Sequence, residues 1–156
     1  MKETGTTSRP PPASRAEILI RAQSWLADSV GYDAEGFHDN EFGSYRTDCS
    51  GYVSMAWGLP GRPADARGGP NTVDLTRLAV RLDKTELRAG DAVIAAIGGF
   101  RDRHATLFAR WDGPDFRTYW AYEHATGVGT VHRRIPYPYE RSPEHYHPYR
   151  NPCFSL

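Results

Sequence analysis

The chain lacks an excess of charge of either sign, and this absence argues against two classes of partner. Its 156 residues include 19 Lys+Arg and 19 Asp+Glu, so the formal net charge is zero. A nucleic-acid-binding domain usually carries a basic excess, and a polybasic membrane anchor carries a basic cluster. We therefore expect neither nucleic acid nor a membrane as a partner. The length corresponds to one domain.

Cysteine is also scarce, because only Cys49 and Cys153 occur in the sequence. Small secreted domains that depend on disulfides normally contain more cysteines than this. The neighbourhoods of the two residues differ strongly, so we expect one functional and one incidental thiol instead of a bridge.

Long apolar segments are missing as well. No run in the sequence approaches the length of about 18 residues that predicts a transmembrane helix. The first 17 residues contain no apolar segment of the kind found in secretory signals. The expectation is a cytoplasmic protein, or a secreted one whose export signal has been removed.

The two ends of the chain differ in composition from its middle. Residues 1–13 are polar and end in three consecutive prolines, which predicts a disordered segment. Residues 14–156 are expected to form a single domain. Its last part, 138–156, is rich in Pro, Tyr and His and is expected to be an irregular tail.

The first half of the domain shows helical and loop patterns. Residues 14–30 begin with an S-x-x-E capping box and continue with apolar residues at helical spacing, which predicts an amphipathic helix. Glycines and an Asp-Asn pair predict a loop over 31–47, and Gly and Pro predict another over 58–72. The segments 49–57 and 73–82 each fit a short helix or a strand.

The second half shows strand patterns instead. Short apolar or alternating segments cover 91–97, 104–111, 117–124 and 131–137, and turn residues separate them. Four such segments joined by short turns predict an antiparallel meander. Because the helices precede the strands, the fold class is expected to be α+β. N-terminal helices would pack on an antiparallel sheet of about four to six strands.

The most informative segment surrounds Cys49. Asp48 is a good N-cap residue, so Cys49 would lie in the first turn of a helix over 49–57. The positive end of the helix dipole stabilises a thiolate, which is the nucleophilic form of cysteine. The small residues Ser50 and Gly51 would let a substrate approach closely, and the backbone N–H of Cys49 would contribute to an oxyanion hole.

A nucleophilic cysteine needs a base, which is normally a histidine oriented by a third polar group. His104 opens one predicted strand and His124 ends the next one. A hairpin turning at 112–114 would bring both side chains to neighbouring rungs, which predicts a Cys49–His104–His124 triad. Glu123 would face the opposite side of the strand. A shift of the register by one residue would make Glu123 the orienting group instead.

Four motifs resemble those of one family, the NlpC/p60-type papain-like cysteine peptidases. The segment 48–53, Asp-Cys-Ser-Gly-Tyr-Val, resembles its nucleophile motif, and 87–91, Leu-Arg-Ala-Gly-Asp, resembles the turn before its first core strand. The segment 104–108, His-Ala-Thr-Leu-Phe, resembles the strand that bears the base, and the pair His124-Ala125 resembles the strand of the third residue. The four motifs occur in the family's order.

The resemblance implies a papain-like fold and a catalytic domain over residues 14–156. In the family, the residues on either side of the nucleophile hold the free amino end of a cell-wall peptide, and Asp48 and Ser50 match these positions. Tyr45 lies in the region where the family often places an active-site tyrosine. The chain departs from the family where Gly43-Ser-Tyr replaces a usual Gly-Gly pair upstream of the nucleophile.

Three hypotheses about function follow. The first is a cysteine-dependent amide hydrolase that forms an acyl-thioester, with a peptidoglycan stem peptide cut after D-glutamate as the substrate that the resemblance implies. The second is an intracellular acyltransferase or amidase acting on a small metabolite, and the third is a catalytically silent binding module. A zinc site of Cys49, His104 and His124 is disfavoured, because no C-x-x-C or H-x-x-x-H spacing is present. We expect no cofactor and a monomer.

Overall fold

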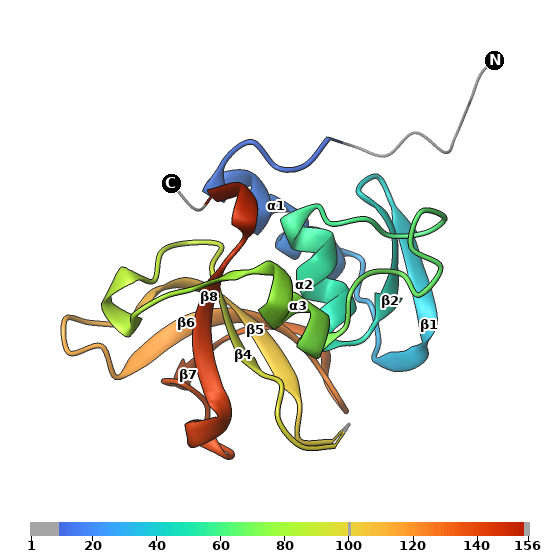
Figure 1. The fold of residues 1–156 in the computed structure, drawn as a ribbon. Coiled ribbons are helices and arrows are strands. Elements are labelled where there is room, and N and C mark those ends of the chain that lie inside the picture. The colour runs from blue at the N-terminus through green and yellow to red at the C-terminus, as the bar shows by residue number, and fades with distance from the viewer. Residues whose placement is uncertain (1–9, 100, 155–156) are drawn as a thin grey trace.

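A computed structural model of the chain describes residues 10–99 and 101–154 (Figure 1). Within these ranges the chain forms three α-helices, a two-stranded ribbon and a six-stranded antiparallel sheet. The α+β class is therefore confirmed. The helices lie together on one side of the curved sheet, as Figure 1 shows.

The two longer helices begin at the residues that the sequence predicts. In α1 (Arg15–Ala27) the Ser14 hydroxyl accepts a hydrogen bond from the Glu17 N–H. In α2 (Cys49–Trp57) the Asp48 carboxylate accepts one from the Gly51 N–H at 2.8 Å. Every residue of α2 is buried, so tertiary packing stabilises this short helix. The third helix, α3 (Thr72–Leu78), follows the predicted loop.

The predicted meander is present. Its strands are β4 (Ala92–Ala95), β5 (His104–Trp111), β6 (Thr118–Ala125) and β7 (Gly129–Pro136). The full order of the sheet is β3-β8-β4-β5-β6-β7. The remaining elements are β3 (Val80–Arg81), β8 (Tyr146–Arg150) and the 3₁₀-helices Lys84–Glu86, Pro143–His145 and Pro152–Phe154.

The sequence-based expectation about the C-terminal end of the domain is wrong. The segment 138–156 is not irregular throughout, because β8 inserts between β3 and β4 and pairs with both. Residues 1–9 lie outside the described ranges, but the described end of the expected disordered segment is packed. There, Pro12 is buried and the carbonyl of Pro10 accepts a hydrogen bond from Arg21.

The expected loop over 31–47 is also wrong. It forms a hairpin of β1 (Asp33–Asn40) and β2 (Gly43–Thr47), which is paired antiparallel. The glycines and the Asp-Asn pair that favour a loop lie within β1 or at its turn. β1 alternates between exposed and half-buried residues and carries few strong strand formers, so its sequence shows little strand signal.

The core has two parts, one on each face of the sheet. Side chains of α1 and α2, including Trp25 and Tyr52, pack on the helix-covered face against Ile94 and Leu107. On the other face, Phe108 belongs to a second cluster that includes residues of β6, β7 and β8. Both faces are thus buried around β5, the strand that carries His104. None of the helices among the described residues is long and apolar enough to cross a membrane.

Candidate functional site

The N-terminus of α2 meets the start of β5, and this contact joins Cys49 to His104. Cys49 is the first residue of α2, and only 8% of its surface is exposed. His104 is the first residue of β5, and Cys49 lies close enough to its imidazole to help raise the pKa of the ring. The two residues that the sequence singles out as nucleophile and base are therefore neighbours in the structure.

A buried carboxylate orients the other side of the imidazole ring. Oε1 of Glu123 lies 2.6 Å from Nε2 of His104, and Glu123 has no exposed surface. Because Nε2 binds the carboxylate, Nδ1 is the nitrogen available to Cys49. The geometry is that of a nucleophile, a base and an orienting group in series.

The strand pairing explains why the third group is a glutamate. Nearer the hairpin turn, Arg110 pairs with Trp120, but further along Phe108 pairs with Ala121. Ala109 is therefore an extra residue on β5, which defines a β-bulge. Successive side chains alternate between the faces of a sheet, so one extra residue exchanges the faces of all later pairs.

The bulge places Glu123 on the face of His104 and sends His124 to the other face. The expectation that His124 orients His104 is therefore wrong in its geometry, and the alternative with Glu123 agrees with the structure. His124 is fully buried against the helices, with its ring edge-on to Trp25 at a centroid distance of 5.3 Å. Burial lowers its pKa, which favours the neutral ring.

Two further donors hold Glu123 in place. The hydroxyl of Tyr139 donates to Oε1 at 2.8 Å, and Nε of Arg133 donates to Oε2 at 2.7 Å. The ring of Tyr139 also packs beside the ring of His104, with centroids 5.0 Å apart. Tyr139 belongs to the segment that the sequence assigned to an irregular tail. That segment therefore supplies part of the site.

The electrostatics favour charged forms of both His104 and Glu123. Burial alone would lower the pKa of His104, but the hydrogen bonds to Cys49 and Glu123 outweigh it and raise the pKa to about 9. Burial would likewise raise the pKa of Glu123, yet His104, Tyr139 and Arg133 hold it at about 2. At neutral pH the site therefore holds an imidazolium next to the sulfur of Cys49.

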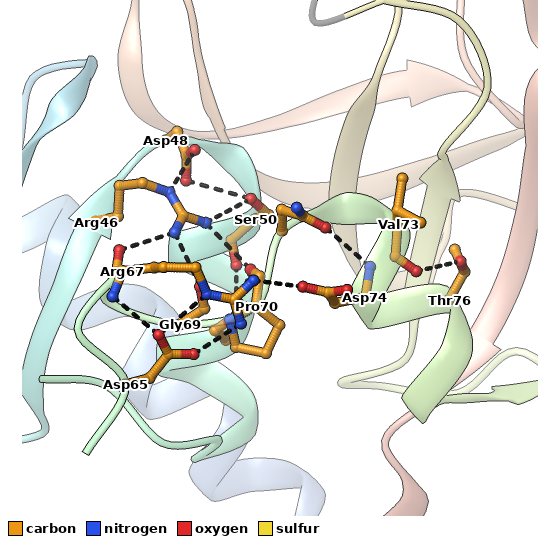
Figure 2. Close-up of polar contacts among 12 residues, drawn as sticks. Arg46, Asp48, Ser50, Asp65, Arg67, Gly69, Pro70, Val73, Asp74 and Thr76 are labelled. Atoms are coloured by element: carbon orange, nitrogen blue, oxygen red, sulfur yellow. Dashed lines mark hydrogen bonds and ion pairs between the residues drawn. The ribbon is translucent and has the colours of Figure 1, made fainter.

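A second polar cluster lies at the start of α2, around Arg46 (Figure 2). Its guanidinium donates to Oδ2 of Asp48 at 2.7 Å and to Oγ of Ser50 at 2.9 Å. It also donates to three backbone carbonyls, those of residues 67, 69 and 70. Arg46 thereby ties the loop before α3 to the first turn of the helix that carries Cys49.

This arrangement changes the interpretation of Asp48 and Ser50. Both oxygens of Asp48 are engaged, Oδ2 by Arg46 and Oδ1 by the N–H of Gly51 and the hydroxyl of Ser50. The positive charge of Arg46 compensates the carboxylate, so little net negative charge is left to attract a substrate amine. These contacts within the protein give Asp48 and Ser50 a structural role at the start of α2.

The same loop is fixed by Arg67, which Figure 2 shows beside the Arg46 cluster. Arg67 bridges Asp65 and Asp74, with ion-pair distances of 2.9 Å and 2.6 Å. Asp74 lies in the first turn of α3. The two arginines thus connect α2, the loop and α3 into one unit.

Tyr45 has a structural contact, whereas Tyr32 and Tyr146 are influenced by Cys49. Tyr45 is buried, and its hydroxyl donates to the carbonyl of Leu59. Burial raises the pKa of Tyr32 and of Tyr146, and the charge of Cys49 raises both further. The ring of Tyr32 stacks on the ring of His124, with centroids 5.5 Å apart.

Four residues of the site were missed by sequence reasoning, namely Tyr32, Arg46, Arg133 and Tyr139. Arg46 precedes the nucleophile motif by two positions, and a charged residue next to a buried helix start is a signal that could have been used. The other three carry no local signal, because long-range pairing brings them to the site.

The second thiol is free, and the described residues contain no group of metal ligands. Cys49 and Cys153 are both free, and Cys153 is exposed. Across residues 10–99 and 101–154, no three His, Cys, Asp or Glu side chains form a group that could hold a metal ion. Comparisons with protein-family models, with curated proteins and with solved structures give no match.

Proposed function

We propose that the chain is a cysteine-dependent amide hydrolase with Cys49 as nucleophile, His104 as base and acid, and Glu123 as orienting carboxylate. The observation that carries this proposal is the hydrogen bond between His104 and the buried Glu123, with Cys49 at the start of α2 next to the same imidazole. Glu123 could serve only to hold His104 in place on its strand. That role would leave unexplained why Cys49, at the start of a helix, lies next to the same histidine.

The proposed reaction proceeds through an acyl-thioester. The Cys49 thiolate attacks the amide carbonyl and forms a sulfur–carbon bond. The imidazolium of His104 gives its proton to the leaving amine as the carbon–nitrogen bond breaks. Water then attacks the thioester, His104 takes one of its protons, and the carboxylic acid and the thiolate are released.

The first turn of α2 is suited to the charge that develops on the carbonyl oxygen. The N–H groups at the start of a helix have no acceptor within the helix. The backbone N–H of Cys49 is one of these, and it would donate to the oxyanion next to the reacting sulfur. The positive end of the helix dipole acts in the same direction.

The substrate class is the less constrained part of the proposal. The resemblance of residues 48–53, 87–91 and 104–108 to NlpC/p60-type peptidases supports a papain-like fold and a peptidoglycan stem peptide as substrate. The engagement of Asp48 and Ser50 by Arg46 instead favours a substrate without a free amino end at this position. An amidase or acyltransferase acting on a small molecule, in which an amine or alcohol replaces water, is therefore the second candidate.

Thiol reactivity tests the catalytic part. Incubation with iodoacetamide at neutral pH, followed by peptide mass spectrometry, should show that Cys49 is alkylated faster than the exposed Cys153, although Cys49 is buried. The substitution His104→Ala should abolish this difference. Equal or slower alkylation of Cys49 in the wild type would overturn the proposal.

Product analysis tests the substrate. Muropeptides are incubated with the wild type and with Cys49→Ser, and the products are identified by mass spectrometry. Cleavage that depends on Cys49 supports the cell-wall peptidase, whereas intact muropeptides together with a fast-reacting Cys49 support the small-molecule amidase or acyltransferase.

A further inference from the structure

A groove of about 570 Å³ lies between the end of α1 and the turn that joins β6 to β7, and it has no assigned role. One wall is formed by the end of α1 and the loop that follows it, and the other by the turn between β6 and β7. Nine residues line it, and none of them has a charged side chain. The groove therefore offers no partner to a charged group, and a charge would lose hydration by entering it.

Apolar side chains stand exposed on both walls. Leu26 on one wall is 39% exposed, and Val128 on the other is 52% exposed. Gly31 and Gly127 leave open space around their α-carbons, since a β-carbon added at either glycine would meet no other atom within 4 Å. An apolar group of a ligand would cover Leu26 and Val128 and gain the free energy of removing that surface from water.

His124 joins the two walls from beneath. Its Nδ1 lies 2.8 Å from Oγ1 of Thr130, and its Nε2 lies 3.1 Å from the carbonyl oxygen of Gly31. Thr130 and Gly31 belong to opposite walls. A fully buried residue with both ring nitrogens engaged keeps the width of the groove constant, which gives His124 a role outside the triad.

Tyr32 connects the groove to the thiol. It lines the groove, and its ring stacks on His124. It precedes Asp33, which pairs with Thr47, so the start of β1 lies beside the segment that leads into Cys49. A substrate whose carbonyl lies at Cys49 would therefore extend past Tyr32 into the groove.

We propose that this groove binds an uncharged group of the substrate, such as an aliphatic or aromatic side chain or an acyl chain. The inference rests on the proposed function, because it takes Cys49 as the point of attack. Such a groove selects neutral amides over substrates that present a carboxylate or an ammonium group next to the scissile bond.

The test uses alkylating probes that require no knowledge of the natural substrate. Three chloroacetamides of similar size carry an N-butyl, an N-carboxypropyl or an N-aminopropyl group, and their rates of alkylation at Cys49 are compared with that of iodoacetamide. In the wild type the butyl probe should react about tenfold faster than either charged probe, after correction for their reactivity with a free thiol.

Two substitutions locate the effect in the groove. Gly31→Leu places a side chain in open space at a position without a left-handed φ, so it should fill the groove and remove the advantage of the butyl probe. Val128→Lys should raise the relative rate of the carboxylate probe. Ile20→Lys is the matched control, because Ile20 is 53% exposed and does not line the groove. It should leave the ratios unchanged.

The outcomes separate the two proposals. Slow alkylation by iodoacetamide would overturn the catalytic proposal itself. Fast alkylation by iodoacetamide, combined with equal corrected rates for the three probes, would overturn the groove alone. The same conclusion follows if Gly31→Leu and Val128→Lys leave the probe ratios of the wild type unchanged.

Discussion

The carboxylate of Glu123 lies 2.6 Å from the imidazole of His104, and it reaches this position only because of the bulge at Ala109. Without the extra residue, alternation along the strand would direct His124 to this face and Glu123 away from it. The identity of the third group in the site is thus decided by one unpaired residue in the middle of β5.

The first prediction concerns the charge on Glu123. Glu123→Gln keeps the shape of the side chain but removes the negative charge that stabilises the imidazolium. The pKa of His104, about 9 in the wild type, should fall by at least about one unit. Titration of the imidazole by NMR measures this directly. An unchanged pKa would contradict a direct ionic contact, and Arg134→Gln, which removes a partner of Asp112, is the control.

The second prediction concerns the hydroxyl of Tyr139. Tyr139→Phe keeps the ring beside His104 but removes one donor from Oε1 of Glu123. The carboxylate then acts more strongly on the imidazolium, so the pKa of His104 should rise by roughly half a unit. The same NMR titration distinguishes this from a purely structural role. A fall in the pKa would mean that Tyr139 serves mainly to keep the carboxylate in place.

The third prediction concerns the pH dependence of stability. His104 has a pKa raised from 6.5 to about 9, so its contribution is fully present below pH 6.5 and is lost as the pH rises through 9. Glu123 has a pKa lowered from 4.5 to about 2, so its contribution is present above pH 4.5 and is lost as the pH falls toward 2. The free energy of unfolding should therefore differ most between the wild type and Glu123→Gln from about pH 4.5 to 6.5.

Urea denaturation at a series of pH values measures this difference. It should shrink toward both pH 9 and pH 2, because one member of the pair then loses its charge. A difference that is constant from pH 3 to pH 9 would show that the pair contributes only through packing.

The fourth prediction concerns Arg46. Arg46→Met should lower the free energy of unfolding by about 3 kcal/mol, because it leaves the mostly buried carboxylate of Asp48 without its partner. Arg46→Lys should recover only part of this loss, since an ammonium group cannot reproduce the planar fork. Urea denaturation gives both values. Arg117→Ala is the matched control, with a side chain that is 84% exposed, and should change stability by less than about 0.5 kcal/mol.

The fifth prediction explains the glycine two positions after the nucleophile. A β-carbon at Gly51 would lie 1.9 Å from the carbonyl oxygen of Arg46, which is a backbone atom. Gly51→Ala should therefore destabilise the fold by about 3 kcal/mol or more. Gly31→Ala meets no atom within 4 Å and should change stability by less than about 1 kcal/mol. Thermal unfolding of the two variants tests this contrast, and equal losses would contradict it.

Local sequence features were sufficient to predict several elements of this fold. The capping residues Ser14 and Asp48 mark the starts of α1 and α2, because an N-cap depends only on its own side chain and the next turn. The strand over 104–111 has the bounds that alternation and turn residues predict. The motifs also single out Cys49 and His104, and the structure places the start of α2 next to the start of β5.

Other elements of the fold could not be predicted from local sequence features. In the hairpin of β1 and β2, β1 contains a glycine and several charged residues and has no buried residue, so its strand is defined by pairing with β2. β8 becomes a strand because β4 offers it a free edge. Arg133 reaches Glu123 from the neighbouring strand β7, and Tyr139 reaches it from the segment between β7 and β8.

The sequence by itself therefore determined the α+β class, the helix that carries Cys49 and the choice of His104, because caps, periodicity and motif spacing act over a few residues. The tertiary structure alone decided that Glu123 and not His124 orients the imidazole, that Arg46 occupies Asp48 and Ser50, and that His124 supports an uncharged groove. Each of these depends on register and packing between distant segments, and one bulged residue in a strand is enough to exchange the two faces of the sheet.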